Sequence, residues 1–190
     1  MAAEDPRWAA SESRLVEAIR DEILAAPDGR ITFARFMERA LTEPGLGYYA
    51  TSELRPTRAG DYLTAPELHP FFGRCLSRVV SAAWDASASA PLRVLEYGGG
   101  RGTLRNDATD GLGFNVAWIR ADLPDRTDDD GRPVDLVIAN EYLDALPVHR
   151  LLGGERLQEA FVGWQDGWFS EVLDEPSTTE LAAHLAADGV

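Results

Sequence analysis

Hydrophobic side chains recur at helical spacing in three stretches of the first half of the chain. Residues 11–26 and 32–41 have apolar positions three and four residues apart, and Thr32 is placed to cap the second helix. After the loop-like residues 42–63, a longer helix is predicted to start at Thr64. The side chains expected to point inward from this helix are Leu68, Phe71, Phe72, Cys75, Leu76, Val79, Val80 and Trp84.

In the second half of the chain, short apolar runs replace the helical spacing. The run that ends at Glu96 and the stretches 114–121 and 134–139 predict strands. Residues 155–164 and 168–173 flank a polar turn with glycine and predict a β-hairpin. Because strands and helices interleave, the pattern predicts an α/β sandwich.

The composition fits one folded domain with a small appendage. With 190 residues, 45% of them hydrophobic, the chain can bury a core. No apolar run approaches the ~20 residues of a membrane-spanning helix, and the N-terminus lacks a signal-peptide pattern. Cys75 is the single cysteine, so no disulfide and a cytoplasmic location are expected. The three histidines have no ligand-like spacing, and no metal site is predicted.

Charge narrows the range of partners. The basic residues are 18 arginines against 32 acidic residues, which gives a net charge of −14. Such a surface repels phosphate, so neither nucleic acid nor an anionic membrane is an expected partner. It suits a cationic substrate such as an arginine-rich protein, although an acidic surface also serves solubility alone.

The most informative motif is a glycine loop after the predicted strand that ends at Glu96. Glycines at positions 98, 100 and 102 give the pattern E-x-G-x-G-x-G. Glycine permits unusual backbone dihedrals and a close approach of a ligand, and an acid at the strand tip suits an amino group or a ribose hydroxyl. The pattern is typical of S-adenosylmethionine-dependent methyltransferases. The dinucleotide fingerprint needs its third glycine where Thr103 stands, so NAD or FAD binding is less favoured. A glycine-rich turn without a ligand is the simplest alternative.

A second polar cluster follows the strand predicted at 134–139. Asn140, Glu141 and Asp144 come directly after it, where open α/β sheets bind ligands. The Asn140 amide can accept a hydrogen bond from a substrate amine, and Glu141 and Asp144 are spaced to share one face of a helical turn. Carboxylates there would orient a guanidinium, which stays protonated near neutral pH. Alternatively, Asn140 caps a helix and Asp144 is solvated.

Five motifs in order resemble the MidA family of methyltransferases, which includes the mitochondrial complex I assembly factor that methylates a protein arginine. They are Ile31-Thr32-Phe33-Ala34-Arg35-Phe36-Met37, Gly47-Tyr48-Tyr49, Gly60-Asp61-Tyr62-Leu63-Thr64-Ala65-Pro66-Glu67, the glycine loop, and Asn140-Glu141 with Asp144-Ala145-Leu146-Pro147. The resemblance implies a Rossmann-like class I methyltransferase core over residues 91–190, with the hairpin as an insertion. It also implies an N-terminal helical and loop region, residues 1–90, that covers the cofactor.

The resemblance also implies the roles of individual residues. Those expected on the methionine and ribose side of S-adenosylmethionine are Glu96, Gly98, Gly100 and Gly102, followed by Thr103. Those expected to approach from the covering loop are Gly60, Asp61 and Thr64. Asn140 and Glu141, supported by Asp144, are expected to orient the acceptor nitrogen. Asp122 with Leu123 resembles the pair that meets the adenine amino group and ring.

One departure from the family puts cofactor binding in question. Leu104 and Val116 are 12 residues apart, too few for the further helix and strand that family members place there, with an acid for the ribose hydroxyls. The leading hypothesis is a methyltransferase acting on a protein arginine and releasing S-adenosylhomocysteine. The alternatives are a small-molecule N- or O-methyltransferase and a degenerate methyltransferase fold that serves as an assembly or interaction protein. A methyl acceptor is the predicted partner, and a homodimer is left open.

Overall fold

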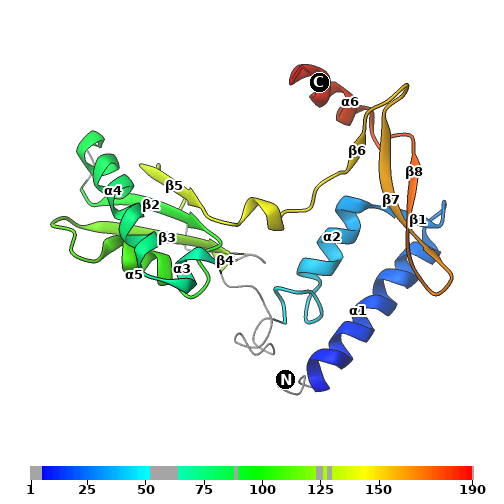
Figure 1. The fold of residues 1–190 in the computed structure, drawn as a ribbon, viewed down its shortest axis with the longest axis horizontal. Coiled ribbons are helices and arrows are strands. Elements are labelled where there is room, and N and C mark those ends of the chain that lie inside the picture. Colours follow the sequence, from blue (N-terminus) through cyan, green and yellow to red (C-terminus); the bar gives the residue numbers. More distant parts are fainter. Residues whose placement is uncertain (1–5, 52–63, 88–89, 123–125, 128–129, 190) are drawn as a thin grey trace. The chain divides into compact units, whose positions relative to one another are not determined.

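The computed structural model describes residues 6–51, 64–87, 90–122, 126–127 and 130–189 (Figure 1). The chain forms two compact units. One, the hairpin unit, combines Met1–Pro56 with Leu146–Val190, and the other, the glycine-loop unit, is Thr57–Ala145. The boundary predicted at residue 90 coincides with neither junction between these units.

The hairpin unit is built around one long central strand. Its elements are α1 (Pro6–Ala25), β1 (Arg30–Thr32), α2 (Phe33–Thr42), β6 (Leu151–Leu152), β7 (Gln158–Gln165), β8 (Trp168–Asp174) and α6 (Thr179–Ala187). Strand β7 pairs antiparallel with β8 from Glu159 to Gln165, and with β1 and β6 on its other edge. The predicted hairpin is therefore confirmed, with Asp166 and Gly167 at its turn in left-handed conformation (φ 51° and 82°).

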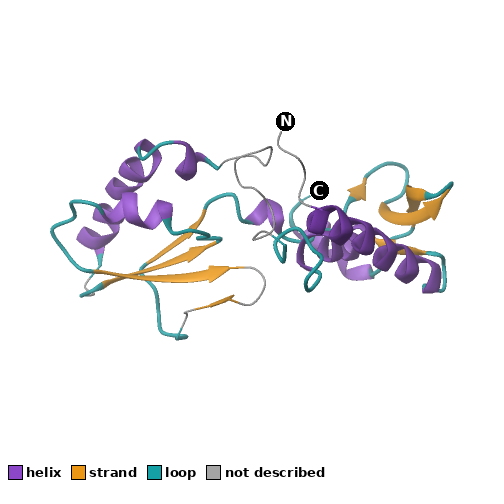
Figure 2. Cartoon of the chain, turned by 90° about the horizontal axis from the view of Figure 1, so that it is seen from below, coloured by secondary structure: helices purple, strands orange, loops and turns teal. Residues whose placement is uncertain are grey.

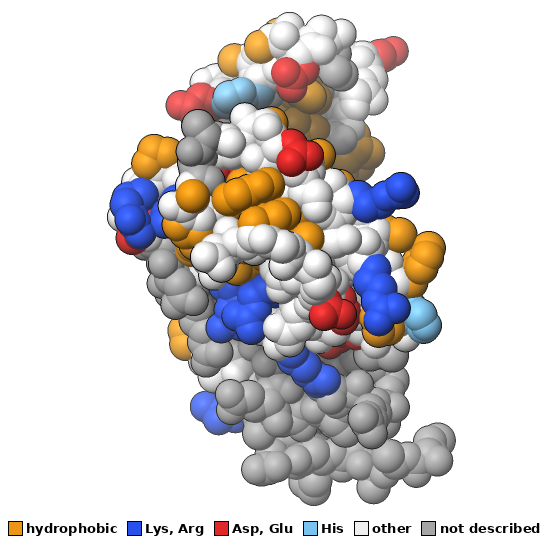
Figure 3. Space-filling model, turned by 90° about the vertical axis from the view of Figure 1, so that its left-hand side faces the viewer, with side chains coloured by type: hydrophobic (Ala, Val, Ile, Leu, Met, Phe, Trp, Pro, Cys, Tyr) orange, Lys and Arg blue, Asp and Glu red, His pale blue; other side chains and the backbone are white. Residues whose placement is uncertain are grey.

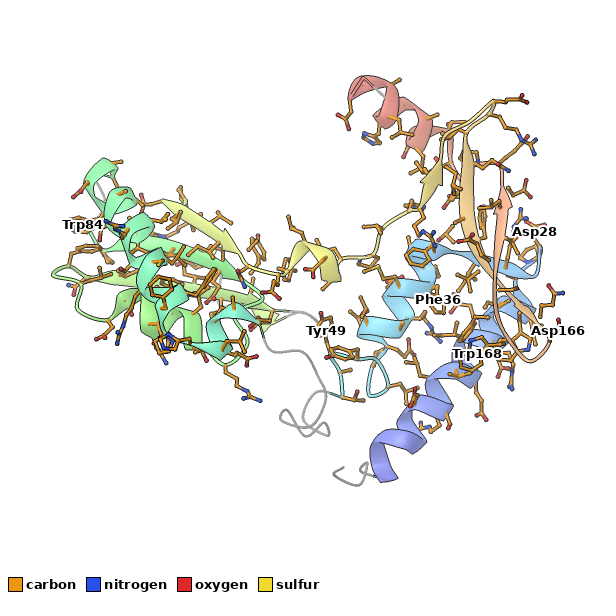
Figure 4. All side chains as sticks on the ribbon, in the orientation of Figure 1. Asp28, Phe36, Tyr49, Trp84, Asp166 and Trp168 are labelled. Carbon is orange, nitrogen blue, oxygen red and sulfur yellow. The ribbon has the colours of Figure 1, made fainter. Side chains whose placement is uncertain are left out.

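Helices α1 and α2 contribute the apolar core of this unit. Ile19 and Ile23 of α1 are buried with Ile31 and Val162. Phe36 of α2 packs edge-on against the β8 ring of Phe169, with centroids 5.1 Å apart. Figure 4 shows Phe36 among these side chains, and the labelled Trp168 near the hairpin turn. The N-cap predicted for α2 is confirmed, because the Thr32 hydroxyl accepts a hydrogen bond from the Arg35 backbone N–H at 3.1 Å.

The glycine-loop unit is an α/β structure whose central strands are parallel. Its elements are α3 (Ala65–Leu68), α4 (Phe71–Ala86), β2 (Leu92–Tyr97), α5 (Thr103–Thr109), β3 (Val116–Asp122), β4 (Arg126–Thr127), β5 (Leu136–Ala139) and the 3-10 turn η2 (Leu143–Ala145). The strand order is β4-β3-β2-β5, with β2 parallel to both β3 and β5. Helices lie on one face of this sheet (Figure 2). The arrangement confirms the predicted Rossmann-like fold.

Helix packing in this unit depends on a close contact between α4 and α5. The apolar core joins Val80 of α4 and Leu104 of α5 to the strand residues Leu92 and Val94. A Cβ atom added at Gly73 would lie 2.3 Å from the Cβ of Asp107. Glycine is therefore needed where α4 meets the helix that follows the glycine loop.

The predicted helix from Thr64 is wrong in two respects. It is interrupted at His69, which is extended (φ −162°, ψ 140°) because it precedes Pro70. In addition, Leu68, Phe71 and Val79 are 66%, 68% and 48% exposed and Cys75 is also exposed, although all four were expected inward. The apolar surface of α4 is wider than the stripe that packs on the sheet, so a second stripe faces outward. Hydrophobic side chains on the surface are visible in Figure 3.

Candidate functional site

The glycine loop leaves β2 at its carboxyl end and turns directly into α5. Gly98, Gly100 and Gly102 have φ angles of +72°, +47° and +76°, a region that L-residues with side chains rarely adopt. A Cβ added at Gly100 or Gly102 would have no neighbour closer than 3.9 Å. Space therefore remains over the loop for a ligand, and this cradle fits a nucleotide-type cofactor. Thr103, the first residue of α5, is partly buried beside it.

Glu96 lies beneath the loop and is only 2% exposed. The indole Nε1–H of Trp118 donates a hydrogen bond of 2.7 Å to its Oε2 atom. Burial raises the pKa of Glu96, and the bond from Trp118 opposes this without cancelling it. A carboxyl group in this state gains from any further donor that reaches it, such as the amino group of a ligand.

Asp122 is brought to the loop by the strand order. It is the last residue of β3, the parallel neighbour of β2, and its Oδ1 accepts a hydrogen bond from the Gly100 N–H at 3.2 Å. The structure thus places Asp122 beside the loop residues with which it was grouped from sequence. In this chain β3 directly follows α5 and pairs with β2, which places Asp122 at this position.

Arg120 was not recognised from sequence. Its Nη1 donates to the Gly100 carbonyl at 3.0 Å, so it braces the loop from the same strand as Asp122. Gly99 fits tightly between groups of this region: an added Cβ would lie 2.8 Å from Glu96 Oε2 and 3.2 Å from Arg120 Cδ. The sequence carried one signal for Arg120, its position two residues before Asp122, but alternation alone does not show that the side chain reaches across to the loop.

Asn140 and Glu141 follow β5, the other parallel neighbour of β2, so they lie at the same edge of the sheet as the glycine loop. Glu141 adopts φ 49°, an uncommon conformation for a residue other than glycine and one found preferentially at functional sites. Its Oε1 accepts from the Ala65 N–H at 3.4 Å and lies 3.5 Å from Asn140 Nδ2. This contact brings the segment after Thr64 to the second polar cluster.

Asp144 is less closely integrated. It is exposed and lies in η2, which begins at Leu143, so Glu141 is outside the turn that holds Asp144. The expectation that both carboxylates share one helical turn is therefore wrong. Gly60, Asp61 and Leu123 lie outside the described residues. Across the described part of the chain, no group of three His, Cys, Asp or Glu residues is arranged to hold a metal.

A family profile described as "Putative S-adenosyl-L-methionine-dependent methyltransferase" matches residues 107–189. The match includes β3, β5 and the Asn140-Glu141 cluster and begins after the glycine loop. It confirms, independently of the loop, the family resemblance carried by the motifs.

Curated relatives carry the comparison into the first half of the chain. "Protein arginine methyltransferase NDUFAF7 homolog, mitochondrial" of Drosophila melanogaster is 27% identical over 223 residues, covering 86% of this chain and 49% of the relative. The zebrafish (Danio rerio) and human proteins named "Protein arginine methyltransferase NDUFAF7, mitochondrial" are 35% identical over 94 residues and 38% identical over 80 residues, covering 49% and 42% of this chain and 22% and 18% of their own length. The chain thus spans about half the length of the fly relative and a smaller share of the zebrafish and human proteins. The fly alignment is longer than this chain, so that relative has segments absent here.

Proposed function

We propose that this protein, a relative of the MidA-type S-adenosylmethionine-dependent methyltransferases, transfers a methyl group to the guanidinium of a protein arginine. The observation that carries the proposal is the meeting of two polar motifs at one sheet edge. The glycine loop follows β2, and Asn140 and Glu141 follow its parallel neighbour β5. A donor and an acceptor held by these neighbouring strand ends would be close enough for direct transfer.

The cofactor supplies an activated methyl group on a sulfonium when bound. In this assignment Gly98, Gly100 and Gly102 allow its close approach, since the loop is open above the last two. Glu96 receives its amino group, which explains why a buried carboxyl with one described donor is placed there. Asp122, fixed by the Gly100 N–H, holds the adenosine side.

Asn140 and Glu141 are assigned to the acceptor. Arginine stays protonated near neutral pH, so its attacking nitrogen must be oriented by carboxylate and amide oxygens. As the new N–C bond forms, the bond between the methyl group and the sulfonium sulfur breaks, S-adenosylhomocysteine leaves, and the nitrogen releases a proton to solvent. Glu141 is positioned by its left-handed backbone and its contact with the Ala65 N–H. Asp144 adds negative charge on the turn that follows.

The first experiment is calorimetric titration with S-adenosylhomocysteine. We expect one-to-one micromolar binding by the unmodified protein and none by Gly100→Val, whose side chain would fill the cradle. Gly111→Val is the matched control, because Gly111 also has a positive φ (+75°) and open surroundings but lies beyond α5. Equal affinity in both variants would remove the loop assignment. Absence of binding by the unmodified protein would favour the degenerate, partner-binding alternative.

Glu141→Gln separates binding from transfer. The amide keeps an oxygen for the Ala65 N–H, so cofactor affinity should be retained while methylation of an arginine peptide is lost. Glu155→Gln, a change of an exposed glutamate in the hairpin unit, is the control. Turnover by Glu141→Gln equal to that of the control would exclude Glu141 from the mechanism. Methylation of small amines instead of the peptide would favour the small-molecule alternative.

The cellular location and the oligomeric state of the protein remain predictions. None of the described helices is long and apolar enough to cross a membrane. The names of the relatives place them in mitochondria, whereas the single cysteine led us to expect a cytoplasmic protein. Fractionation of the source cells and sizing of the purified protein would decide location and the predicted choice between monomer and homodimer.

A further inference from the structure

Two tyrosines stand side by side where the glycine loop meets the Asn140-Glu141 cluster. Tyr97 is the last residue of β2, and Tyr142 follows Glu141. Their ring centroids are 5.3 Å apart and their planes are tilted by 31°. Both side chains are partly buried, so each is held by its surroundings and still presents some surface.

Tyr142 is held against the loop itself. A Cβ atom at Gly98 would lie 3.0 Å from Tyr142 Cδ2 and 3.3 Å from its Cβ. The absence of a side chain at Gly98 is therefore explained by this ring as well as by the positive φ angle. Because Tyr142 also packs against Tyr97, its ring links the first glycine of the loop to the second polar motif.

Negative charge lies near the pair. Burial raises the pKa of Tyr142, and the negative charges of Tyr97 and Asp122 raise it further. Along β2 the side chains alternate, so Tyr97 faces away from the side of the sheet where Glu96 and Arg120 pair in register. Tyr97 therefore starts from the opposite side of the sheet to Arg120, the arginine that braces the loop.

We infer that Tyr97 and Tyr142 form a binding site for an organic cation at the junction of the two motifs. This inference rests on the proposed function, which brings two such cations together, the sulfonium of S-adenosylmethionine and the guanidinium of the acceptor. The negative face of an aromatic ring attracts a cation within about 6 Å of its centre, and Asp122 adds to that attraction. The pair would favour the charged cofactor over its neutral product.

The test compares ligands that differ in charge. Affinities for S-adenosylmethionine and S-adenosylhomocysteine are measured by calorimetry for the unmodified protein, Tyr142→Leu, Tyr142→Phe and Tyr97→Leu. We expect Tyr142→Leu and Tyr97→Leu to lose about tenfold in affinity for the sulfonium while binding of the thioether changes by less than about twofold. Tyr142→Phe keeps the ring face and should keep the preference. Trp168→Leu, which removes an exposed ring of the hairpin unit, is the control.

A second arm identifies which cation is bound. N-acetyl-arginine amide is titrated with S-adenosylhomocysteine at saturation, and its citrulline analogue is the neutral reference. A loss confined to the arginine probe in Tyr142→Leu assigns the pair to the acceptor, and a loss confined to S-adenosylmethionine assigns it to the cofactor.

An equal change for charged and neutral ligands, or none, overturns the cation site while leaving the proposed function intact. Failure of the unmodified protein to bind any of these ligands overturns both.

Discussion

Among the described residues, each unit buries one glutamate, and the surroundings of the two carboxylates differ. Glu96 of the glycine-loop unit is 2% exposed and Glu159 of the hairpin unit is 0% exposed. Glu159 has a partner for each oxygen: His149 Nδ1 lies 2.7 Å from Oε1, and the Ser177 N–H donates to Oε2 at 2.6 Å. In the part of the chain that the structure describes, Trp118 is the single hydrogen-bond donor to Glu96.

The pKa values follow from this difference. Burial raises the pKa of both groups, but at Glu159 the bonds from His149 and Ser177 outweigh it and the pKa is lowered. At Glu96 burial prevails and the pKa is raised. A buried carboxylate with a hydrogen-bond partner for each oxygen stabilises the fold, whereas one with fewer donors can accept a further hydrogen bond from a ligand. This contrast separates a structural acid from a candidate binding acid that a sequence motif alone cannot distinguish.

The largest expected effect is the loss of the satisfied carboxylate. Glu159→Ala leaves the Ser177 N–H and His149 without their acceptor and opens a cavity beside β7. We expect the free energy of unfolding of the hairpin unit to fall by about 3–5 kcal/mol, measured by native-state hydrogen exchange of β7 amides. Glu171→Ala on β8, which removes an exposed ion pair with Arg150, should cost less than about 1 kcal/mol. Equal losses would show that Glu159 has no special structural role.

Removing His149, one of the two described hydrogen-bond partners of Glu159, should shift the pKa of Glu159 in the direction seen at Glu96. His149→Ala leaves the Ser177 N–H as the remaining described donor, so the pKa of Glu159 should rise and the unit should lose about 1–3 kcal/mol of stability. The same exchange experiment reports the stability. Protection of β7 amides that is unchanged from the unmodified protein would show that His149 contributes nothing to holding the carboxylate.

Glu96→Gln should weaken ligand binding and leave stability almost unchanged, the reverse of the change at Glu159. The amide oxygen still accepts from Trp118, and a buried charge is removed, so the stability of β2 should stay within about 0.5 kcal/mol of its original value. Affinity for S-adenosylhomocysteine should fall about tenfold because a charge-assisted bond is lost. Calorimetry and exchange of β2 amides test both parts, and loss of β2 protection with unchanged affinity would assign Glu96 to the fold instead.

The smallest expected effect is that the stability contributions of Glu159 and Glu96 change in opposite directions with pH. Because the folded-state pKa of Glu159 is lowered, its stabilisation is present above the unfolded value of about 4.3 and is lost as pH falls through the folded value. For Glu96, whose pKa is raised, the contribution is present below about pH 4.3 and is lost as pH rises through the folded value. Stability differences from Glu159→Gln and Glu96→Gln, followed over pH by exchange at β7 and β2, should therefore change in opposite directions. Parallel curves would contradict the comparison.

Local signals in the sequence predicted most of the elements. The cap at Thr32, the β-hairpin and the glycine loop depend on residues close together in the chain, so their spacing was sufficient. Asp122 was grouped with the loop by resemblance, and the parallel pairing of β2 and β3 brings it there.

Features that depend on distant partners were missed. Nothing near Phe71 indicates that α4 offers only one of its two apolar stripes to the sheet. Arg30–Thr32 is too short to be recognised as a strand, and its partner is β7. The strained backbone of Glu141 and the packing of Tyr142 on Gly98 also arise from contacts that no spacing encodes.

The discontinuity of the hairpin unit has a consequence for the order in which a ribosome delivers its parts. Residue Arg30 of β1 pairs with Gly163 of β7, and Ile19 and Ile23 pack with Val162. These apolar side chains emerge long before their partners are synthesised, whereas Thr57–Ala145 is delivered as one uninterrupted piece. The inserted unit can therefore fold while the first two helices still expose their apolar faces. In that interval these two helices can be bound by a chaperone.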